Sequence, residues 1–244
     1  MTDCIIEARS VRKTLGQGAG EVEALRGIDL SLRPGELTLL MGPSGSGKTT
    51  LLLVLGCMLV PSSGTVTVRG VPVDGGEKER LAQIRRDHIG FVFQSYHLFP
   101  TLTAARNVQL ALDIRGEYGR RAARRSLAAL RLVGLEQKVA AYPGELSGGE
   151  QQRVAIARAI VANPAAVLAD EPTAALDSDN GRTIMRILAS IAHERGSAVL
   201  VVTHDPRVVP FADRIVEIVD GQLVDDSPRG QERVRIPTAA TLVR

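Results

Sequence analysis

The chain has 244 residues, of which 44% are hydrophobic and 23% charged, a composition that suits one large α/β domain and excludes disorder as its main state. Its net charge of +3 comes from 30 basic and 27 acidic side chains, and two cysteines, Cys4 and Cys57, are too few for a disulfide framework. The 4 Phe and 3 Tyr residues are too few for a surface that stacks nucleic-acid bases, and no apolar run reaches the roughly 18 residues of a membrane span.

The first part of the chain has the pattern of a sheet domain. Leu37–Met41 is an apolar run that ends at Gly42, which predicts a buried parallel strand, and a helix should follow from Lys48 to about Cys57. Alternating and β-branched residues predict further strands, and one more segment has helical character. The strands are expected at Ile5–Ala8, Ile28–Leu32, Thr65–Arg69 and Ile89–Phe93, and the helix at Glu77–Arg86.

Helical spacing dominates from Ser95 to about Val161, and we interpret residues 95–161 as a helical subdomain inserted into the sheet domain. Its helices are expected at Thr103–Leu112, at Arg121–Val133 and from Ser147 onward. The sheet pattern then resumes, and a strand–helix–strand order implies a βαβ unit and a parallel sheet. The strands are expected at Ala166–Ala169, Ala198–Val202, Ile215–Val219 and Gln222–Val224, with a helix at Ser178–His193 and a hairpin turn at Asp220-Gly221.

A glycine-rich segment between the predicted strand Leu37–Met41 and the helix after it matches the pattern G-x-x-x-x-G-K-[ST]. Its glycines let the backbone curl so that N–H groups face an anion, and the helix N-terminus adds partial positive charge. Lys48 can reach the β- and γ-phosphates, and the Thr49 hydroxyl can bind Mg²⁺. We therefore expect a nucleoside triphosphate to be bound by Gly42, Pro43, Ser44, Gly45, Ser46, Gly47, Lys48, Thr49 and Thr50.

Three polar segments follow predicted parallel strands, and the carboxyl ends of such strands meet along one edge of a sheet. Gly42 follows one strand, Asp170-Glu171 a second, and His204 comes just after a third. At this edge Asp170 can hold Mg²⁺ through water, Glu171 can orient and polarise the attacking water, and His204 can bind the γ-phosphate. We predict Glu171, His204 and Lys48 to be catalytic. A polar strand end and a plain loop histidine are the structural alternatives.

Leu146-Ser147-Gly148-Gly149-Glu150-Gln151 precedes a helical pattern, and Ser147 and Glu150 have the spacing of a capping box. The segment therefore has a purely structural interpretation as a helix start. Two adjacent glycines in a first turn cost about 1 kcal/mol each relative to alanine, however, which favours close approach of a ligand to Ser147, Gly148 and Gly149. Within one chain this second anion site should lie far from the phosphate loop. A head-to-tail homodimer that shares two ATP molecules would bring the two sites together.

Taken together, these residues closely resemble the ATP-binding subunit of ABC transporters, from about Ile5 to Val224. The family's segments occur in its order: the phosphate loop Gly42–Thr49, Gln94 after a strand, the signature segment Leu146–Gln151, the acid pair Asp170-Glu171, the loop Ala174-Ala175-Leu176-Asp177 and the switch histidine His204. The resemblance implies that ATP and Mg²⁺ are bound, with Thr49, Gln94 and Asp170 at the metal. It also implies that Gln94 relays to an integral membrane permease and that Asp177 couples two sites across a homodimer. Without the resemblance, Gln94 would be a solvated residue at a strand end.

Within the family, three segments look most like the lipoprotein-release and macrolide-export branch, namely Glu23–Gly27, Leu55–Cys57 and His88–Gln94. One position departs from the family pattern: Leu15 stands where an aromatic side chain usually stacks on adenine, so adenine would rest on an aliphatic surface. A basic cluster in the helical subdomain is either a solvated helix face or a contact with the membrane partner or lipid headgroups. It comprises Arg120, Arg121, Arg124, Arg125 and Arg131.

The sequence thus predicts a P-loop NTPase of α/β class, with a mostly parallel core sheet, an antiparallel β subdomain and the inserted helical subdomain. We expect an ABC ATPase domain over residues 1–226 that binds no nucleic acid. It would be cytoplasmic, peripheral on the inner face of the cell membrane through its permease, and would drive export or the extrusion of lipoprotein or peptide. An importer ATPase, a soluble ABC ATPase of repair or translation, and a GTPase switch are the alternatives; the last lacks an Asn-Lys-x-Asp guanine reader. Residues 227–244 should form a flexible tail, and their 4 Arg and 1 Glu carry the whole net charge of +3.

Overall fold

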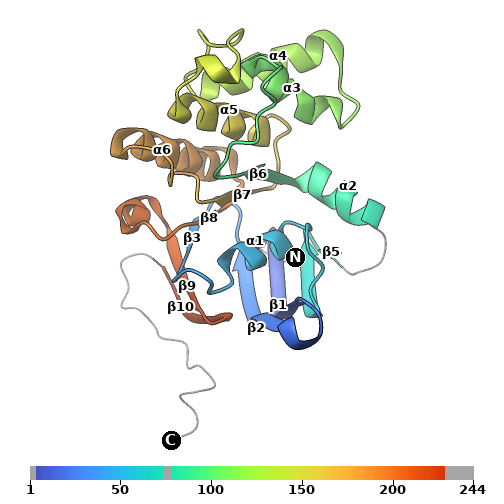
Figure 1. The fold of residues 1–244 in the computed structure, drawn as a ribbon. Coiled ribbons are helices and arrows are strands. Elements are labelled where there is room, and N and C mark those ends of the chain that lie inside the picture. Colours follow the sequence, from blue (N-terminus) through green and yellow to red (C-terminus); the bar gives the residue numbers. More distant parts are fainter. Residues whose placement is uncertain (1–3, 74–77, 229–244) are drawn as a thin grey trace, which may run out of the picture.

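The computed structural model describes residues 4–73 and 78–228, which form an α/β fold with two sheets (Figure 1). Within these residues the core sheet has six strands in the order β10-β9-β3-β8-β7-β6, and neighbours are parallel except for β9 and β10. The other sheet has four antiparallel strands in the order β2-β1-β4-β5. The strands are β1 Ile6–Leu15, β2 Val22–Leu32, β3 Leu37–Met41, β4 Ser63–Val68, β5 Val71–Pro72, β6 Ile89–Val92, β7 Ala166–Asp170, β8 Ala198–Val202, β9 Arg214–Val219 and β10 Gln222–Pro228.

Three neighbouring strands form the centre of the core sheet because their side chains are apolar on both faces. Nearly all residues of β3, β7 and β8 are buried, as expected for parallel strands covered by helices. The strands lie in the order β3-β8-β7, so their carboxyl ends meet at one edge. The predicted parallel core and antiparallel β subdomain are confirmed. The sheet domain also contains α1 (Lys48–Leu55), α2 (Lys78–His88) and α6 (Ser178–Arg195).

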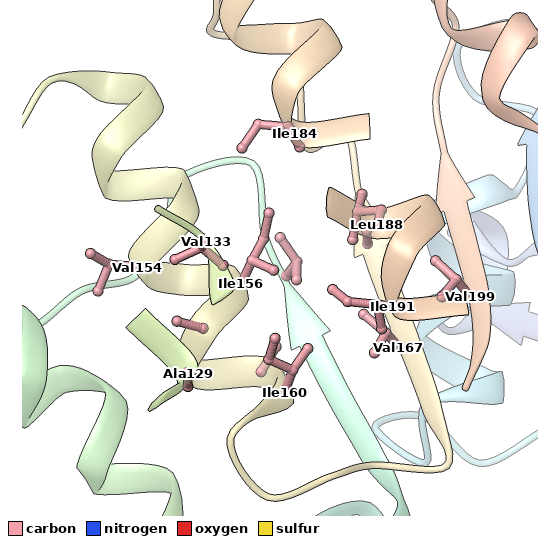
Figure 2. Packing of buried hydrophobic residues seen from close by; sticks show 14 of the residues in the cluster. Ala129, Val133, Val154, Ile156, Ile160, Val167, Ile184, Leu188, Ile191 and Val199 are labelled. Atoms are coloured by element: carbon pink, nitrogen blue, oxygen red, sulfur yellow. The ribbon is translucent and has the colours of Figure 1, made fainter. Parts of the chain in front are cut away.

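The helical subdomain consists of α3 (Ala104–Asp113), α4 (Gly119–Leu132) and α5 (Gly148–Ile160), drawn at the top of Figure 1. Its helices pack against each other, and α5 also faces α6. A single buried cluster continues from these helices into the core sheet, where Ile156 and Ile160 lie near Leu188 of α6 (Figure 2). The subdomain is therefore joined to the sheet by apolar packing as well as by its chain connections.

The segment that leads from β6 into the helical subdomain is held by one buried amide. Asn107 of α3 accepts a hydrogen bond from the backbone N of Phe99 at 2.8 Å and donates to the carbonyls of Phe99 at 3.1 Å and Leu102 at 2.9 Å. Thr103 caps the same helix by accepting from the backbone N of Arg106 at 3.4 Å. Because an amide offers both donors and an acceptor, it satisfies several polar groups of this loop at once. The loop therefore has a fixed course.

Three strands are at least four residues longer than their sequence patterns predict. β1 continues to Leu15, and β2 begins as early as Val22, because cross-strand pairing rather than burial holds this end of their hairpin. β10 continues past Val224 to Pro228, since it stays paired with β9. Residues 229–244, most of the predicted basic tail, lie outside the described residues, as does Glu77, the predicted start of α2. In the part of the chain that is described, no helix is both long and apolar enough to cross a bilayer.

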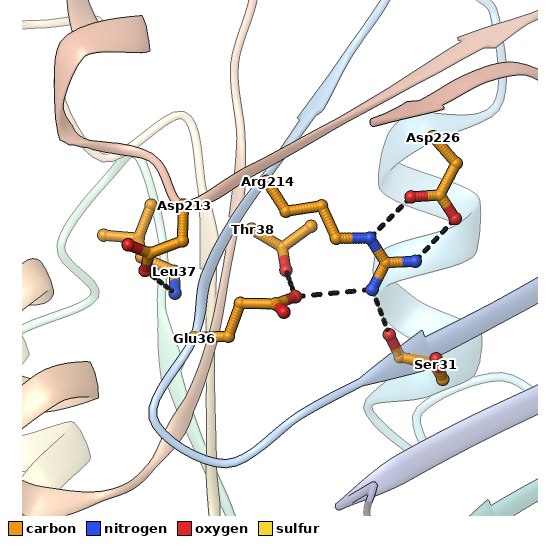
Figure 3. A network of polar contacts seen from close by, with 7 residues as sticks. All are labelled: Ser31, Glu36, Leu37, Thr38, Asp213, Arg214 and Asp226. Carbon is orange, nitrogen blue, oxygen red and sulfur yellow. Dashed lines mark hydrogen bonds and ion pairs between the residues drawn. The ribbon is translucent and has the colours of Figure 1, made fainter. Parts of the chain in front are cut away.

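A charged network joins the two sheets (Figure 3). Arg214 of β9 donates to both carboxylate oxygens of Asp226 on β10, each at 2.5 Å, and to the carbonyl of Ser31 on β2 at 2.7 Å. A carboxylate oxygen of Glu36 lies 3.3 Å from the same guanidinium and accepts from the Thr38 hydroxyl at 2.8 Å. Arg214 is only 9% exposed. The network thus ties the antiparallel sheet to the edge of the core sheet.

Candidate functional site

The phosphate loop lies between β3 and α1, as its sequence pattern predicts. Lys48 opens α1 and is buried, and its ammonium donates to the carbonyls of Gly42 at 2.8 Å and Pro43 at 2.7 Å. Gly47, the residue before the helix, has φ +103°, and no side chain caps this helix end. The first N–H groups of α1 therefore remain free for an anion, which the lysine can also reach by leaving the two carbonyls.

Two glycines of the loop have neighbours that leave no room for a side chain. A Cβ on Gly42 would lie 2.1 Å from the carbonyl oxygen of Ile218 on β9, and one on Gly47 would lie 2.6 Å from that of Ala24 on β2. The turn between β9 and β10 adds a direct support, because the backbone N of Gly221 donates to the carbonyl of Ser46 at 3.0 Å. Sequence reasoning identified this turn only as a hairpin and missed its contact with the phosphate loop.

The acid pair follows β7 beside the loop. The Thr49 hydroxyl of α1 lies 3.5 Å from a carboxylate oxygen of Asp170, and burial, together with the nearby charge of Glu171, raises the pKa of Asp170 above its usual value. Glu171 has φ +47°, which is uncommon for a residue with a side chain, and its backbone N donates to the carbonyl of Val202 on β8 at 2.9 Å. At Glu171 the backbone thus leaves the extended conformation of β7 while staying bonded to the end of β8.

Glu171 and His204 are in direct contact. Nδ1 of His204 lies 2.7 Å from Oε1 of Glu171. The carboxylate is 17% exposed and the imidazole 70% exposed, so the histidine covers the acid from the solvent side. The carboxylate can accept a hydrogen bond from a water molecule, and the imidazole can orient that carboxylate or contact a bound anion.

These groups line a cavity of about 650 Å³. Predicted residues from the phosphate loop and from the ends of β6, β7 and β8 meet in this cavity. Four predicted residues of these segments do not line it: Gly42, Pro43 and Ser46, which form the loop itself, and Asp170, which lies behind Thr49 at 3.5 Å. Its lining comprises Ser44, Gly45, Gly47, Lys48, Thr49, Thr50, Gln94, Glu171, His204, Leu15, Val22, Ala24, Ala174 and Val202.

The oxygen groups in this region suit a magnesium ion that is shared with phosphates. Thr49 and Asp170 face each other, and the amide of Gln94 lines the same cavity. Among the residues that the structure describes, no group of three or more His, Cys, Asp or Glu side chains could hold a metal by itself. Mg²⁺ is commonly bound by one or two protein groups, with water and phosphate oxygens completing its shell, so this sparse set fits the ion.

The signature segment lies at the start of α5 and does not line the cavity. Ser147 and Glu150 form the capping box that their spacing predicts, with hydrogen bonds of 3.3 and 2.8 Å, and the bond from the backbone of Ser147 lowers the pKa of Glu150. A Cβ on Gly149 would lie 2.6 Å from the side-chain oxygen of Asn180 on α6. Packing within the chain therefore requires a glycine here, a reason that the sequence argument from ligand approach did not include.

Asn180 also binds the predicted coupling residue Asp177. Its side-chain amide donates to Asp177 at 2.6 Å, and its backbone N donates at 2.9 Å. Asp177 is the N-cap of α6, and these bonds lower the pKa of its carboxyl group. The side chain of Asn180 thus lies beside Gly149 of the signature segment and is bonded to Asp177.

Comparison with known proteins agrees with this arrangement. A family model described as "ABC transporter" matches residues 25–174. The macrolide export ATP-binding/permease protein MacB of Shigella flexneri is 43% identical over 224 residues, which is 92% of this chain and 34% of that protein. MacB of Escherichia coli strain K12 has the same identity and coverage. The chain thus spans about a third of the length of the curated relatives it matches.

Solved structures of similar proteins confirm the predicted fold class. The ATP-binding cassette MJ0796, in a dimeric post-hydrolysis state bound to ADP and Pi, aligns with a TM-score of 0.84 at 41% identity, covering 93% of this chain and 100% of that chain. The cassette cbiO1 from Clostridium perfringens, part of the transporter complex cbiONQ, aligns with a TM-score of 0.83 at 28% identity, covering 93% of this chain and 89% of that chain.

Proposed function

The chain belongs to the ABC transporter family, and from this premise we propose that it is an ATPase cassette that dimerises on ATP and powers an integral membrane permease. One observation carries the proposal. The phosphate loop, with Asp170 beside its Thr49, meets the Glu171–His204 pair in a single cavity at the carboxyl edge of the core sheet. This arrangement combines an anion-binding helix end with a carboxylate that can activate water.

Hydrolysis would use these side chains in turn. Lys48 would leave the carbonyls of Gly42 and Pro43 and bind the β- and γ-phosphates, because a phosphate offers the ammonium a full opposite charge. Glu171 would accept a hydrogen bond from the attacking water and align it with the γ-phosphate. His204, which contacts Glu171, would orient that carboxylate and donate to the γ-phosphate.

Thr49, Asp170 and Gln94 are the residues that would hold Mg²⁺ with the phosphates. The ion would supply neutralisation of the charge that builds up on the phosphate oxygens. Burial and the nearby charge of Glu171 raise the pKa of Asp170, and a bound cation would favour the ionised form of this carboxyl group.

A homodimer would complete each site. Ser147 is exposed at the N-terminus of α5, and Gly148 beside it is part-buried, so backbone N–H groups there are available to an anion from outside the chain. Because this helix end does not line the phosphate-loop cavity of its own chain, the partner's nucleotide is the anion it would bind. A second solved structure of MJ0796, aligned at 42% identity to this chain, is also dimeric. Asp177, which is bonded to Asn180 beside Gly149, would couple the two sites.

A second cavity, of about 810 Å³ between α2, α3 and β6, is the surface where the permease would dock. Phe99 and Ile114, which line it, are 50% and 63% exposed. Arg158 donates to the carbonyls of Tyr96 at 2.7 Å and His97 at 2.5 Å, and so fixes the segment that connects Gln94 in the nucleotide cavity with Phe99 in this groove. Movement at the nucleotide would thus reach the permease through residues 94–99.

Export is the direction that we favour, because the curated relatives at 43% identity are macrolide export ATP-binding/permease proteins. Such a protein carries its permease, whereas this chain matches the cassette alone, so a separate or attached membrane part would complete the transporter. The cassette would lie at the cytoplasmic face of the membrane, where ATP is available. An import partner is the alternative, and reconstitution with the permease distinguishes the two by the side on which substrate accumulates.

The decisive experiment compares Glu171→Gln with a matched Glu194→Gln control, an exposed acid at the end of α6. We expect Glu171→Gln to lower ATP turnover by about 10²- to 10⁴-fold while ATP binding remains, so that an ATP-bound dimer accumulates in size-exclusion chromatography with light scattering. The control should keep normal turnover. Glu171→Gln chains that remain monomeric with ATP would contradict the shared-site proposal. Lys48→Ala should weaken ATP binding, and an unchanged ATP affinity of this variant would contradict the phosphate-loop assignment.

A further inference from the structure

We propose that the outer face of α4 binds the anionic phospholipid surface of a membrane directly, through four arginines that the fold leaves without a counter-charge. This inference goes beyond the proposed function, because it concerns contact between the cassette and lipid and does not depend on a nucleotide. It rests on the charge, exposure and spacing of the side chains of α4 and on the groove between α4 and α3.

The structure separates the five arginines of α4 into two groups. Arg125 is part-buried, forms an ion pair with Glu117 and donates to the carbonyl of Val161 at 2.8 Å, so its charge is used within the fold. The other four are exposed, and in the part of the chain that the structure describes none of them has an ion pair. They are Arg120, Arg121, Arg124 and Arg131.

This arrangement works against the stability of the helix itself. Arg120 and Arg124 are four residues apart, as are Arg121 and Arg125, and like charges at this spacing repel each other. Arg120 and Arg121 also lie in the first turn, which has no acidic residue and where the partial positive charge of the helix end opposes cations. The excess of charge is local, since residues 1–226 as a whole carry no net charge. Negative charge from outside the chain would offset both effects.

A groove of about 630 Å³ lies beside these arginines, between α3, α4 and residues 139–140. Arg106 of α3 and Arg120 of α4 both line it. Leu127, which is 45% exposed, and Val139 supply apolar lining, and none of the described residues that line this groove is acidic. The groove thus offers two guanidinium groups to a phosphate and an apolar surface to the carbon chain attached to it, which is the combination found in a phospholipid.

The basic groove is a neighbour of the groove where the permease would dock. The helix α3 borders both, because Leu110 and Ile114 line the permease groove and Arg106 and Gln109 line the basic one. In the proposed complex the arginines of α4 would therefore lie beside the permease, within reach of the lipids that surround it.

A lipid surface fits this face better than a folded protein partner does. The cores of protein interfaces are depleted of charge and anchored by aromatic side chains, whereas here guanidinium groups extend from Arg120 to Arg131 and Leu127 is the large apolar residue between them that is exposed. A protein partner would need a matched acid for each arginine, whereas lipid headgroups leave the guanidinium groups hydrated. Helices with about four to eight basic residues are typical of binding to anionic lipids.

The test measures binding of the full chain to vesicles of phosphatidylglycerol and phosphatidylcholine by flotation, without nucleotide. One variant combines Arg120→Gln, Arg121→Gln and Arg124→Gln, which keeps good helix formers at exposed positions. Each arginine near an anionic surface strengthens binding about fivefold, so this variant should bind about 10²-fold more weakly. Vesicles of phosphatidylcholine alone should not bind the native chain, and high salt should release it from the anionic vesicles. Binding that is equal on both kinds of vesicle would overturn the proposal.

The matched control removes the same number of charges from residues 227–244, by Arg229→Gln, Arg233→Gln and Arg235→Gln, and should bind nearly as tightly as the native chain. The α4 variant should keep the native melting temperature and the native ATP turnover in vesicle-free solution, since its three residues lie outside the nucleotide cavity. Equal losses of vesicle binding in the two variants would show that α4 is not the lipid site. Displacement of the vesicles by inorganic phosphate would identify a free anion as the occupant, and binding to polyglutamate without binding to vesicles would identify an acidic polypeptide. Any of these three results would refute the proposal.

Discussion

Replacing Arg214 by methionine should remove the link between the two sheets while keeping most of the side-chain volume. In the native protein the guanidinium is 9% exposed and makes two bonds of 2.5 Å to Asp226, one of 2.7 Å to the carbonyl of Ser31 and one of 3.3 Å to Glu36. Without it, two carboxylates lose their cation. Breaking a buried pair from one side costs about 3–5 kcal/mol. The side chains of Asp226 and Glu36 are 25% and 17% exposed, so water compensates in part, and we expect about 3 kcal/mol.

This loss can be measured by urea unfolding and by thermal melting. For a domain of this size each kcal/mol lowers the melting temperature by about 2 °C or more, so Arg214→Met should melt at least about 6 °C below the native chain. Arg207→Met is the matched control, because Arg207 is 68% exposed and solvent screens its ion pair with Asp205, so its loss should change the melting temperature little. If the two variants lose the same stability, the network in Figure 3 does not hold the sheets together and the reasoning is refuted.

Three further predictions concern residues near the site and in the core. Gly149→Ala should cost about 1–3 kcal/mol of stability in urea unfolding by placing a Cβ against the side chain of Asn180. Asn180→Ala loses its own bond to Asp177, so the Gly149→Ala change is also measured in that background, where it should cost much less; an equal cost in both backgrounds would disprove the packing argument. Cys57 is buried, and burial raises its pKa to about 11, so its thiol stays protonated at pH 8. The thiol should resist iodoacetamide in the folded chain and react fully in urea, which mass spectrometry can measure. Rapid labelling of the folded chain would contradict this prediction. Asp170→Asn should raise the melting temperature of the metal-free chain at pH 7, because an acid whose pKa is raised on folding destabilises the fold while it is ionised. This gain in melting temperature should shrink as the pH falls through the folded pKa toward the unfolded value near 3.8. A gain that does not depend on pH would exclude this cause.

The central strands were predictable because their burial leaves a direct mark in the sequence. β3, β7 and β8 are nearly continuous apolar runs, and their predicted bounds differ from the observed ones by at most one residue. Strand direction then sufficed to predict that the phosphate loop, the acid pair and His204 would meet at one edge, since the ends of parallel strands have no other place to go. The grouping of Lys48, Glu171 and His204 around one cavity follows from this alone.

Contacts between distant segments left no comparable mark. The close approach of Gly42 to Ile218 and the hydrogen bond from Gly221 to Ser46 join parts of the chain that no local pattern relates. The glycine pair predicts close approach of a ligand at Gly149, and no local pattern indicates that Asn180 also lies beside it, because only the packing of α5 on α6 brings that side chain there. The hairpin of β1 and β2 was underestimated because its outer half is held by pairing with the neighbouring strand, and pairing leaves no apolar periodicity.

The contact of the β9–β10 turn with the phosphate loop has a consequence for how the protein is made. The loop near residue 45 leaves the ribosome early, but the carbonyl of Ile218 and the N–H of Gly221 that support it follow more than 170 residues later. At about 5–20 residues per second, the interval is on the order of ten to thirty seconds. During that time the nascent loop lacks the hydrogen bond from Gly221 to Ser46. The phosphate loop can therefore make its full set of native contacts only after translation has passed the turn between β9 and β10.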